Sequence, residues 1–148
     1  MSAEDPLGFD IPSLTDFDQV DEEAFRMKMD LLNHVALSQM DGQTMEIGVG
    51  TQTLDVVVAS TMGSRIRGLS SYVELPHDGM IFIYAEDHSA HFTRDPMSFD
   101  IAIWFFDSEG QMFDFDRGSP VVTASAPYRY VLETSPEVDL HGSLRLKV

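Results

Sequence analysis

The chain has 148 residues, of which 43% are hydrophobic and 10% aromatic, so it can bury one sizeable core without metal or covalent cross-links. It contains no Cys, which excludes disulfides, Cys-ligated zinc and thiol catalysis. Its net charge of -16 at pH 7 repels nucleic acid, so we expect neither DNA nor RNA as a partner.

Residues 1–20 are an acidic arm in which large apolar residues interrupt the carboxylates. Pro6 and Pro12 break regular structure. Disordered tails are usually poorer in large apolar residues than this arm is. Two interpretations stay open: the arm packs on its own domain, or it docks on another subunit or a larger assembly. The apolar anchors for docking would be Leu7, Phe9, Leu14 and Phe17.

Residues 21–40 have the spacing of a helix. Asp21 can cap it, and Asp41 with Gly42 ends it. The apolar side is wide, so we expect the helix to cover a sheet rather than to form a ligand groove. The residues on its central apolar line are Phe25, Met29, Leu32 and Ala36.

From residue 43 onward the apolar period changes from helical spacing to two. Residues 45–49 and 54–58 alternate on either side of a turn at Gly50, which predicts a hairpin. A short helix within 60–71 is expected to end at Gly68. Residues 79–84 read as a strand, and 86–95 as a polar loop.

The stretch from residue 92 to 117 is expected to hold the central hairpin of the fold. Phe99, Ile101, Ile103 and Phe105 would line one strand face, with Trp104 and Phe106 on the other. A turn at 107–110 leads to a returning strand with Phe113 and Phe115 on one face and Asp114 and Asp116 on the opposite face. Three more strands are expected, at 120–124, 128–133 and 143–148.

These elements predict a mostly β fold, a small closed or nearly closed antiparallel β-barrel or sandwich with one N-terminal helix packed on it. We divide the chain into an arm (1–20), a covering helix (21–43) and a β-barrel domain (44–148). No basic region followed by an apolar run begins the chain, and no stretch reaches membrane-spanning length. We therefore expect a soluble protein without a membrane span, cytoplasmic or carried on a particle.

Several short motifs follow one another in an order known from one family. They are Arg67-Gly68-Leu69, Leu75-Pro76, Gly79-Met80-Ile81-Phe82, a run from Phe92 through Phe105-Phe106-Asp107 to Gly110, and Tyr130-Val131-Leu132-Glu133. Over about residues 44–148 the chain thus resembles domain-of-unknown-function family 192, an uncharacterised conserved family. The resemblance implies a compact β-barrel-like fold and no particular activity.

The chain departs from that family directly after Phe92. Where the family usually has Trp-Met-Lys-Asn/Asp, this chain has Thr93, Arg94, Asp95 and Pro96. Any site that the family builds from that Lys is therefore absent or remade. Residues 1–43 also differ, and we expect the particular role of this protein to lie there.

His88 and His91, near Glu86, Asp87 and Asp95, are the best candidates for metal ligands. Their spacing matches no known motif, and all of these residue types are common on solvated loops. We therefore predict no bound metal and no other cofactor.

Arg65 and Arg67 are the candidates for an anion or ligand site, with Arg67 preferred because it lies in the family motif. The alternative is that they pair with some of the 25 acidic residues. The carboxylates of the hairpin, Asp100, Asp107, Asp114 and Asp116, are expected on turns and a solvated strand face rather than as a catalytic pair. No catalytic motif is recognisable.

Two functional hypotheses remain. The first is a non-catalytic structural or interaction module, an accessory protein of a larger assembly such as a virion, whose arm binds a protein partner or a second copy of the chain. The second is a small-ligand or anion-binding β-barrel, or a small hydrolase, with its site near Arg67 and the His88/His91 loop. A concave pocket at which Arg67 and His88 converge would favour the second hypothesis.

Overall fold

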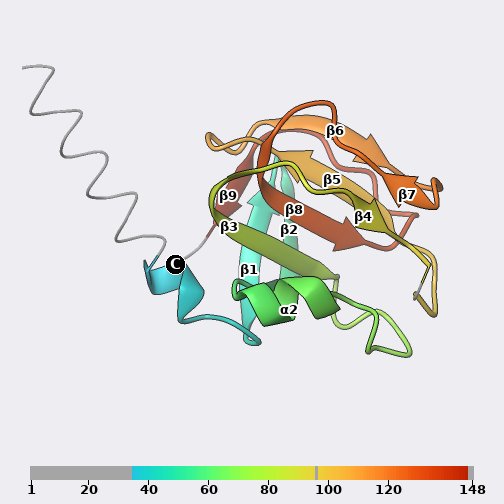
Figure 1. The fold of residues 1–148 in the computed structure, drawn as a ribbon. Helices are drawn as coiled ribbons and strands as arrows, with labels where there is room; N and C mark the ends of the chain where they lie inside the picture. Colours follow the sequence, from blue (N-terminus) through green and yellow to red (C-terminus); the bar gives the residue numbers. More distant parts are fainter. Residues whose placement is uncertain (1–34, 96, 147–148) are drawn as a thin grey trace, which may run out of the picture. The chain divides into compact units, whose positions relative to one another are not determined.

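A computed structural model describes residues 35–95 and 97–146 (Figure 1). The acidic arm and most of the predicted covering helix, with their docking and packing residues, lie outside the described residues. Residues 35–38 are helical and a turn follows. Leu37, in this short helical segment, is 4% exposed and packs in the core. The covering helix over residues 21–43 stays a prediction.

The described part is mostly β, as the sequence predicted. The elements are β1 (Thr44–Val49), β2 (Gln52–Ala59), α2 (Met62–Arg67), β3 (Met80–His88), β4 (Phe92–Thr93), β5 (Ala102–Phe106), β6 (Met112–Asp116), β7 (Val121–Val122), β8 (Tyr128–Thr134) and β9 (Leu144–Leu146).

Seven strands form one curled sheet, a half-barrel, in the order β6-β5-β8-β3-β2-β1-β9 (Figure 1). β4 and β7 make a separate two-stranded ribbon. All pairs are antiparallel except β2 and β3, which are parallel because α2 crosses over between them. The expectation of a wholly antiparallel barrel misses this one crossover.

The helix α2 is fixed at its N-terminal end by a capping box. The Thr61 side chain accepts a hydrogen bond from the Ser64 amide, and the Ser64 side chain accepts one from the Thr61 amide. Asp41 ties this end to the preceding turn, because its Oδ1 accepts from the Ser60 amide at 2.7 Å and from Ser64 Oγ at 2.6 Å. Burial acts to raise the pKa of Asp41, but these hydrogen bonds outweigh it and hold the pKa below its usual value. Gly68 caps the other end, as predicted.

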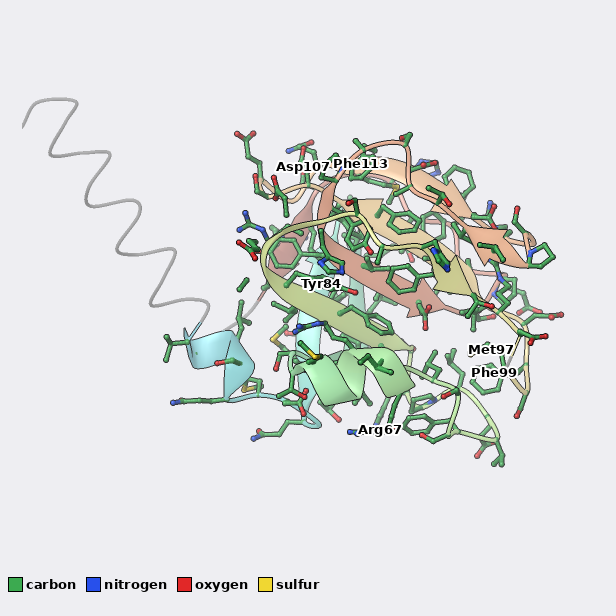
Figure 2. All side chains as sticks on the ribbon, viewed as in Figure 1. Arg67, Tyr84, Met97, Phe99, Asp107 and Phe113 are labelled. Atoms are coloured by element: carbon green, nitrogen blue, oxygen red, sulfur yellow. The ribbon has the colours of Figure 1, made fainter. Side chains whose placement is uncertain are left out.

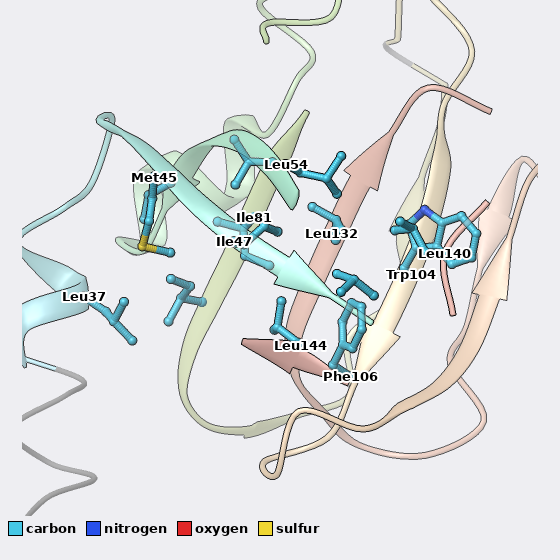
Figure 3. Close-up of a cluster of buried hydrophobic side chains, with 14 of the residues drawn as sticks. Leu37, Met45, Ile47, Leu54, Ile81, Trp104, Phe106, Leu132, Leu140 and Leu144 are labelled. Carbon is cyan, nitrogen blue, oxygen red and sulfur yellow. The ribbon is translucent and has the colours of Figure 1, made fainter. Parts of the chain in front are cut away.

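The sheet is buried on both faces. A first core packs on one face and includes the residues labelled in Figure 3, among them Met45, Ile47, Trp104, Phe106 and Leu132. A second core packs on the other face, with Leu69, Phe82, Ile103, Phe105 and Val131 at its centre.

The central strand β5 is therefore covered on both sides, and all five of its residues are buried. The predicted alternation is confirmed, since Ile103 and Phe105 enter the second core while Trp104 and Phe106 enter the first. The Trp104 indole donates a hydrogen bond to Thr134 Oγ1 at 3.0 Å, which satisfies its one polar atom in the core.

The returning strand β6 differs from the prediction because its register shifts between the partners of Phe105 and Phe106. One extra residue sits there, a β-bulge, which sends the neighbouring side chains to different faces. Phe113 accordingly packs in the second core, whereas Phe115 stacks on Trp104 with ring centroids 5.2 Å apart. The two phenylalanines do not share a face as the simple alternation predicted.

A second correction concerns the loop predicted at 86–95. β3 continues through His88, which pairs with Tyr128 across a shift in register.

Within the described residues, no helix is both long enough and apolar enough to cross a membrane.

Candidate functional site

A cavity of about 360 Å³ opens between α2 and the strands β3, β4 and β8, on the face that holds the second core. α2 supplies Met62, Arg65 and Ile66, and the following turn supplies Leu69. Tyr84 on β3 and Met97, labelled in Figure 2, both line it. α2, which connects the parallel strands β2 and β3, thus forms one side of the cavity.

Aromatic side chains form the wall of the cavity. Phe92 makes an edge contact with Phe82 at 5.6 Å between ring centroids and a tilted contact with Tyr128 at 5.8 Å. Tyr128 in turn lies 5.3 Å from the Tyr84 ring. The Tyr128 hydroxyl donates to the Ala90 carbonyl at 2.6 Å, which ties the loop after β3 to the wall.

The guanidinium of Arg65 lies against this aromatic wall. Its Nη1 donates to the carbonyls of Ser60 at 2.6 Å and Ile83 at 3.0 Å, and its guanidinium carbon lies 4.7 Å from the centre of the Tyr84 ring. These contacts hold the guanidinium in one place beside the cavity. They use only Nη1, so the other donors of the fork are available to a bound anion.

Arg67 also borders the cavity, but from another side of the helix. Residues two apart on a helix point in different directions, and Figure 2 shows Arg67 and Tyr84 on opposite sides of α2. The Arg67 guanidinium makes no hydrogen bond or ion pair with the residues that the structure describes. Of the two predicted arginines, Arg65 is therefore the better placed for a ligand in the cavity.

The two predicted histidines meet at the same cavity. His88 stacks on Tyr84 with ring centroids 4.7 Å apart, and both His88 and His91 are exposed at the rim. Their predicted acidic neighbours are arranged otherwise: Asp87 pairs with Arg129 at 3.1 Å. Among the described residues, no group of three or more His, Asp or Glu side chains lies close enough to hold a metal ion.

A buried carboxyl lies at the floor of the cavity. Glu133 is only 5% exposed and sits on β8 between Met80 of β3 and Ile103 of β5. Burial raises its pKa to about 8, and the charge of Arg94 lowers it in part. The carboxyl makes no hydrogen bond with any residue in the described ranges.

The charge of Arg94 acts on Glu133, but the hydrogen bonds of the Arg94 guanidinium go to other residues. Nη1 bonds Asp116 Oδ1 at 2.6 Å and the Ser119 carbonyl, and Nη2 bonds the carbonyls of Asp116 at 2.8 Å and Ile101 at 3.1 Å. Burial acts to raise the pKa of Asp116, but hydrogen bonds from Ser119, Arg94 and Gly118 lower it to about 2. Asp116 thus belongs to a structural ion pair, not to the solvated face predicted for it.

Sequence reasoning did not select Glu133 or Arg94 as functional residues. In the sequence, Glu133 stands out only as the last residue of the motif Tyr130-Val131-Leu132-Glu133. The one signal for Arg94 was its place in the segment where the chain departs from the family pattern. Neither signal reveals burial, which depends on strands far apart in the sequence.

With its curled half-barrel sheet and one crossover helix, the chain has the fold of a small, mostly β protein. The profile of domain-of-unknown-function family 192, described as "Uncharacterized ACR", matches residues 44–138, which is more than half of the 148 residues. The chain belongs to this family. No curated protein matched the chain.

Two solved structures share the fold. A candidate transcription regulator from Sinorhizobium meliloti 1021 has a TM-score of 0.63 at 19% identity, covering 72% of this chain and 95% of that protein. A protein of unknown function from Novosphingobium aromaticivorans DSM 12444 has a TM-score of 0.57 at 18% identity, covering 70% and 84%. At these identities the likeness extends to the fold alone.

Proposed function

We propose that the protein is a small-ligand-binding module, and that the cavity between α2 and the sheet takes an organic molecule with an apolar body and an anionic group. The observation that carries this proposal is the convergence of Arg65, His88 and His91 on the rim of one cavity with aromatic walls. Small-molecule sites combine such apolar walls with a few placed polar groups.

Charge supports the anionic group. The protein carries a net charge of -16, yet two arginines and two histidines border this cavity, namely Arg65, Arg67, His88 and His91. Two backbone carbonyls already hold the Arg65 guanidinium in place, so little side-chain entropy is lost when an anion binds. The remaining N–H groups of the guanidinium can donate hydrogen bonds to that anion. The rings of Phe82, Phe92 and Tyr128 would cover the apolar body of the ligand.

The competing hypothesis, docking through the acidic arm as an accessory protein of a larger assembly, concerns residues outside the described part of the chain. It stays a prediction. The two roles are compatible, since the cavity belongs to residues 62–133 and the arm to residues 1–20.

A pair of fluorescent probes tests the ligand-binding proposal. 8-Anilinonaphthalene-1-sulfonate carries two aromatic groups and a sulfonate, and N-phenyl-1-naphthylamine has the same body without the charge. We expect the sulfonate probe to bind one site per chain. Arg65→Gln should weaken it about tenfold, which corresponds to ~1.4 kcal/mol, and should change the neutral probe little.

Arg145→Gln is the matched control, because it removes the same charge from β9, away from the cavity. A cooperative thermal melt of each variant ensures that the probe reports the folded protein. Absence of stoichiometric binding, or an equal effect of Arg65→Gln and Arg145→Gln on the sulfonate probe, would refute the proposal.

A further inference from the structure

The floor of the cavity holds a chemical feature that an anion site does not explain. Glu133 lies 95% buried, lines the cavity, and has no hydrogen-bond partner among the described residues. Its oxygens are not among the fully enclosed atoms that lack a partner, so a water or a ligand in the cavity can reach them and supply the hydrogen bonds that a carboxyl in such surroundings requires. The carboxyl is therefore a candidate for direct contact with a ligand.

The charged and titratable groups near Glu133 do not complete it. Arg94 is the cation whose charge acts on it, but both Arg94 Nη atoms are hydrogen-bonded to Asp116, Ser119 and Ile101. The Arg94 Nε is buried and makes no hydrogen bond, so it does not bond the Glu133 carboxyl either. Arg65, His88 and His91 belong to the rim of the cavity. Tyr128 directs its hydroxyl to the Ala90 carbonyl, and Tyr84 remains a neutral phenol because burial raises its pKa.

The rings beside Glu133 favour one kind of ligand group. Phe82, Phe92, Tyr84 and Tyr128 line the same cavity and contact one another in sequence around its wall. The faces of aromatic rings carry partial negative charge, so a set of rings with a carboxylate attracts a cation and disfavours a second anion. An ammonium group also offers the N–H donors or the positive charge that a carboxylate requires.

The Tyr84 ring already has the Arg65 guanidinium 4.7 Å from its centre and His88 stacked on it, so the rings left for a ligand cation are Phe82, Phe92 and Tyr128. We propose that Glu133 and these three rings bind an ammonium group, so that the ligand is a zwitterion with its ammonium at the floor and its anionic group at the rim. This inference rests on the proposed function for the rim and adds the identity of the second polar group. The classes that fit are amino acids and other amino carboxylates with an apolar or aromatic body.

Binding of such a ligand moves a proton. In the free protein at pH 7 the Glu133 carboxyl is mostly protonated, because burial raises its pKa to about 8. A bound ammonium stabilises the carboxylate, so the carboxyl O–H bond breaks and its proton passes to the buffer while the ammonium keeps its own. Binding of the ammonium should therefore release protons at pH 7.

The test compares two compounds that differ only in the group meant for the floor. 4-(Aminomethyl)benzoate carries an ammonium, and 4-(hydroxymethyl)benzoate carries a hydroxyl in its place. Titration calorimetry in buffers of different ionisation enthalpy gives both the affinity and the protons released. We expect the unsubstituted chain to bind the ammonium compound at least tenfold more tightly, with proton release.

Glu133→Gln should abolish both the preference and the proton release while leaving the affinity for 4-(hydroxymethyl)benzoate within about twofold. Glu74→Gln, the same change at an exposed loop residue outside the cavity, should alter neither. The proton count is measured on the unsubstituted chain, so the test does not depend on the folding of the variant.

The outcomes separate this inference from the proposed function. If 4-(hydroxymethyl)benzoate binds but the ammonium brings no preference and no proton release, the role of Glu133 is refuted and the anion site stands. If the preference persists in Glu133→Gln, the ammonium lies elsewhere and the inference is refuted. If neither compound nor the sulfonate probe binds, both proposals fail.

Discussion

Glu133 is a carboxyl residue that the fold removes almost completely from water. Its pKa is about 8 in the folded protein and 4.5 in an unfolded chain, so the folded state holds an extra proton between these pH values. The stability from this site is therefore fully present below about pH 4.5 and is lost as the pH rises through about 8.

Replacing this carboxyl with an amide should remove that pH dependence. We expect Glu133→Gln to be more stable than the unsubstituted chain at pH 9, by on the order of a few kcal/mol, and the difference to shrink toward pH 5. Urea unfolding of both proteins across this range measures it, with Glu74→Gln as the control. Parallel stability curves for the two proteins would show that Glu133 titrates normally.

At the scale of the element, β5 is the strand on which both cores depend. Phe105 is fully buried in the second core and contacts Phe92, Phe113 and Tyr128, whereas Phe115 on the adjoining β6 is 50% exposed. We expect Phe105→Ala to lower the free energy of unfolding by roughly 3–5 kcal/mol. Phe115→Ala removes the same side chain from a half-exposed place and should lower it by only about 1 kcal/mol.

Chemical denaturation of the two variants measures both losses on one scale. A loss below about 1 kcal/mol for Phe105→Ala would contradict the assigned register. Losses of equal size would mean that the rim of β6 is as tightly packed as the centre of β5.

The elements that could be predicted are those set by local pattern. The alternation of Ile103, Trp104 and Phe105 and the positive φ of Gly110 (82°) fix β5 and the turn after it within a few residues. The bulge in β6 could not be predicted, because one extra residue leaves the alternating letters of the sequence unchanged. The parallel pairing of β2 and β3 also depends on packing of the sheet as a whole.

The candidate site divides in the same way. Arg65, His88 and His91 could be selected from residue type alone, but nothing local shows that α2 and the end of β3 border one cavity. Glu133 is buried because β3 and β5 flank β8 on either side, and those strands are about 50 and 30 residues away in the sequence. The burial of Glu133 therefore depends on the order of the strands in the sheet, which no local stretch of sequence specifies.

At the scale of the whole molecule, the arm at residues 1–20 is expected to serve association rather than folding. The family profile begins at residue 44, and the described β elements bury their own cores. Deleting residues 1–20 should therefore leave a folded protein whose melting temperature drops by only a few degrees. It should also weaken self-association or binding to a protein partner, since the arm carries Leu7, Phe9, Leu14 and Phe17.

Sizing chromatography and thermal melts of the full chain and the truncation test this expectation. An unfolded truncation would place the arm in the core of the domain. A folded truncation with unchanged association would leave the arm without the proposed role.

Locating a bound probe by NMR shows directly whether the cavity beside α2 binds a ligand. The chain has nine methionines, which can be labelled with ¹³C at the methyl group. Met62 and Met97 line the cavity, while Met45 and Met112 pack with the first core on the other face of the sheet. On titration with 4-(hydroxymethyl)benzoate, we expect saturable shifts of the Met62 and Met97 methyl signals and unchanged Met45 and Met112 signals. Shifts confined to other methionines, or no saturable shift at all, would contradict this expectation.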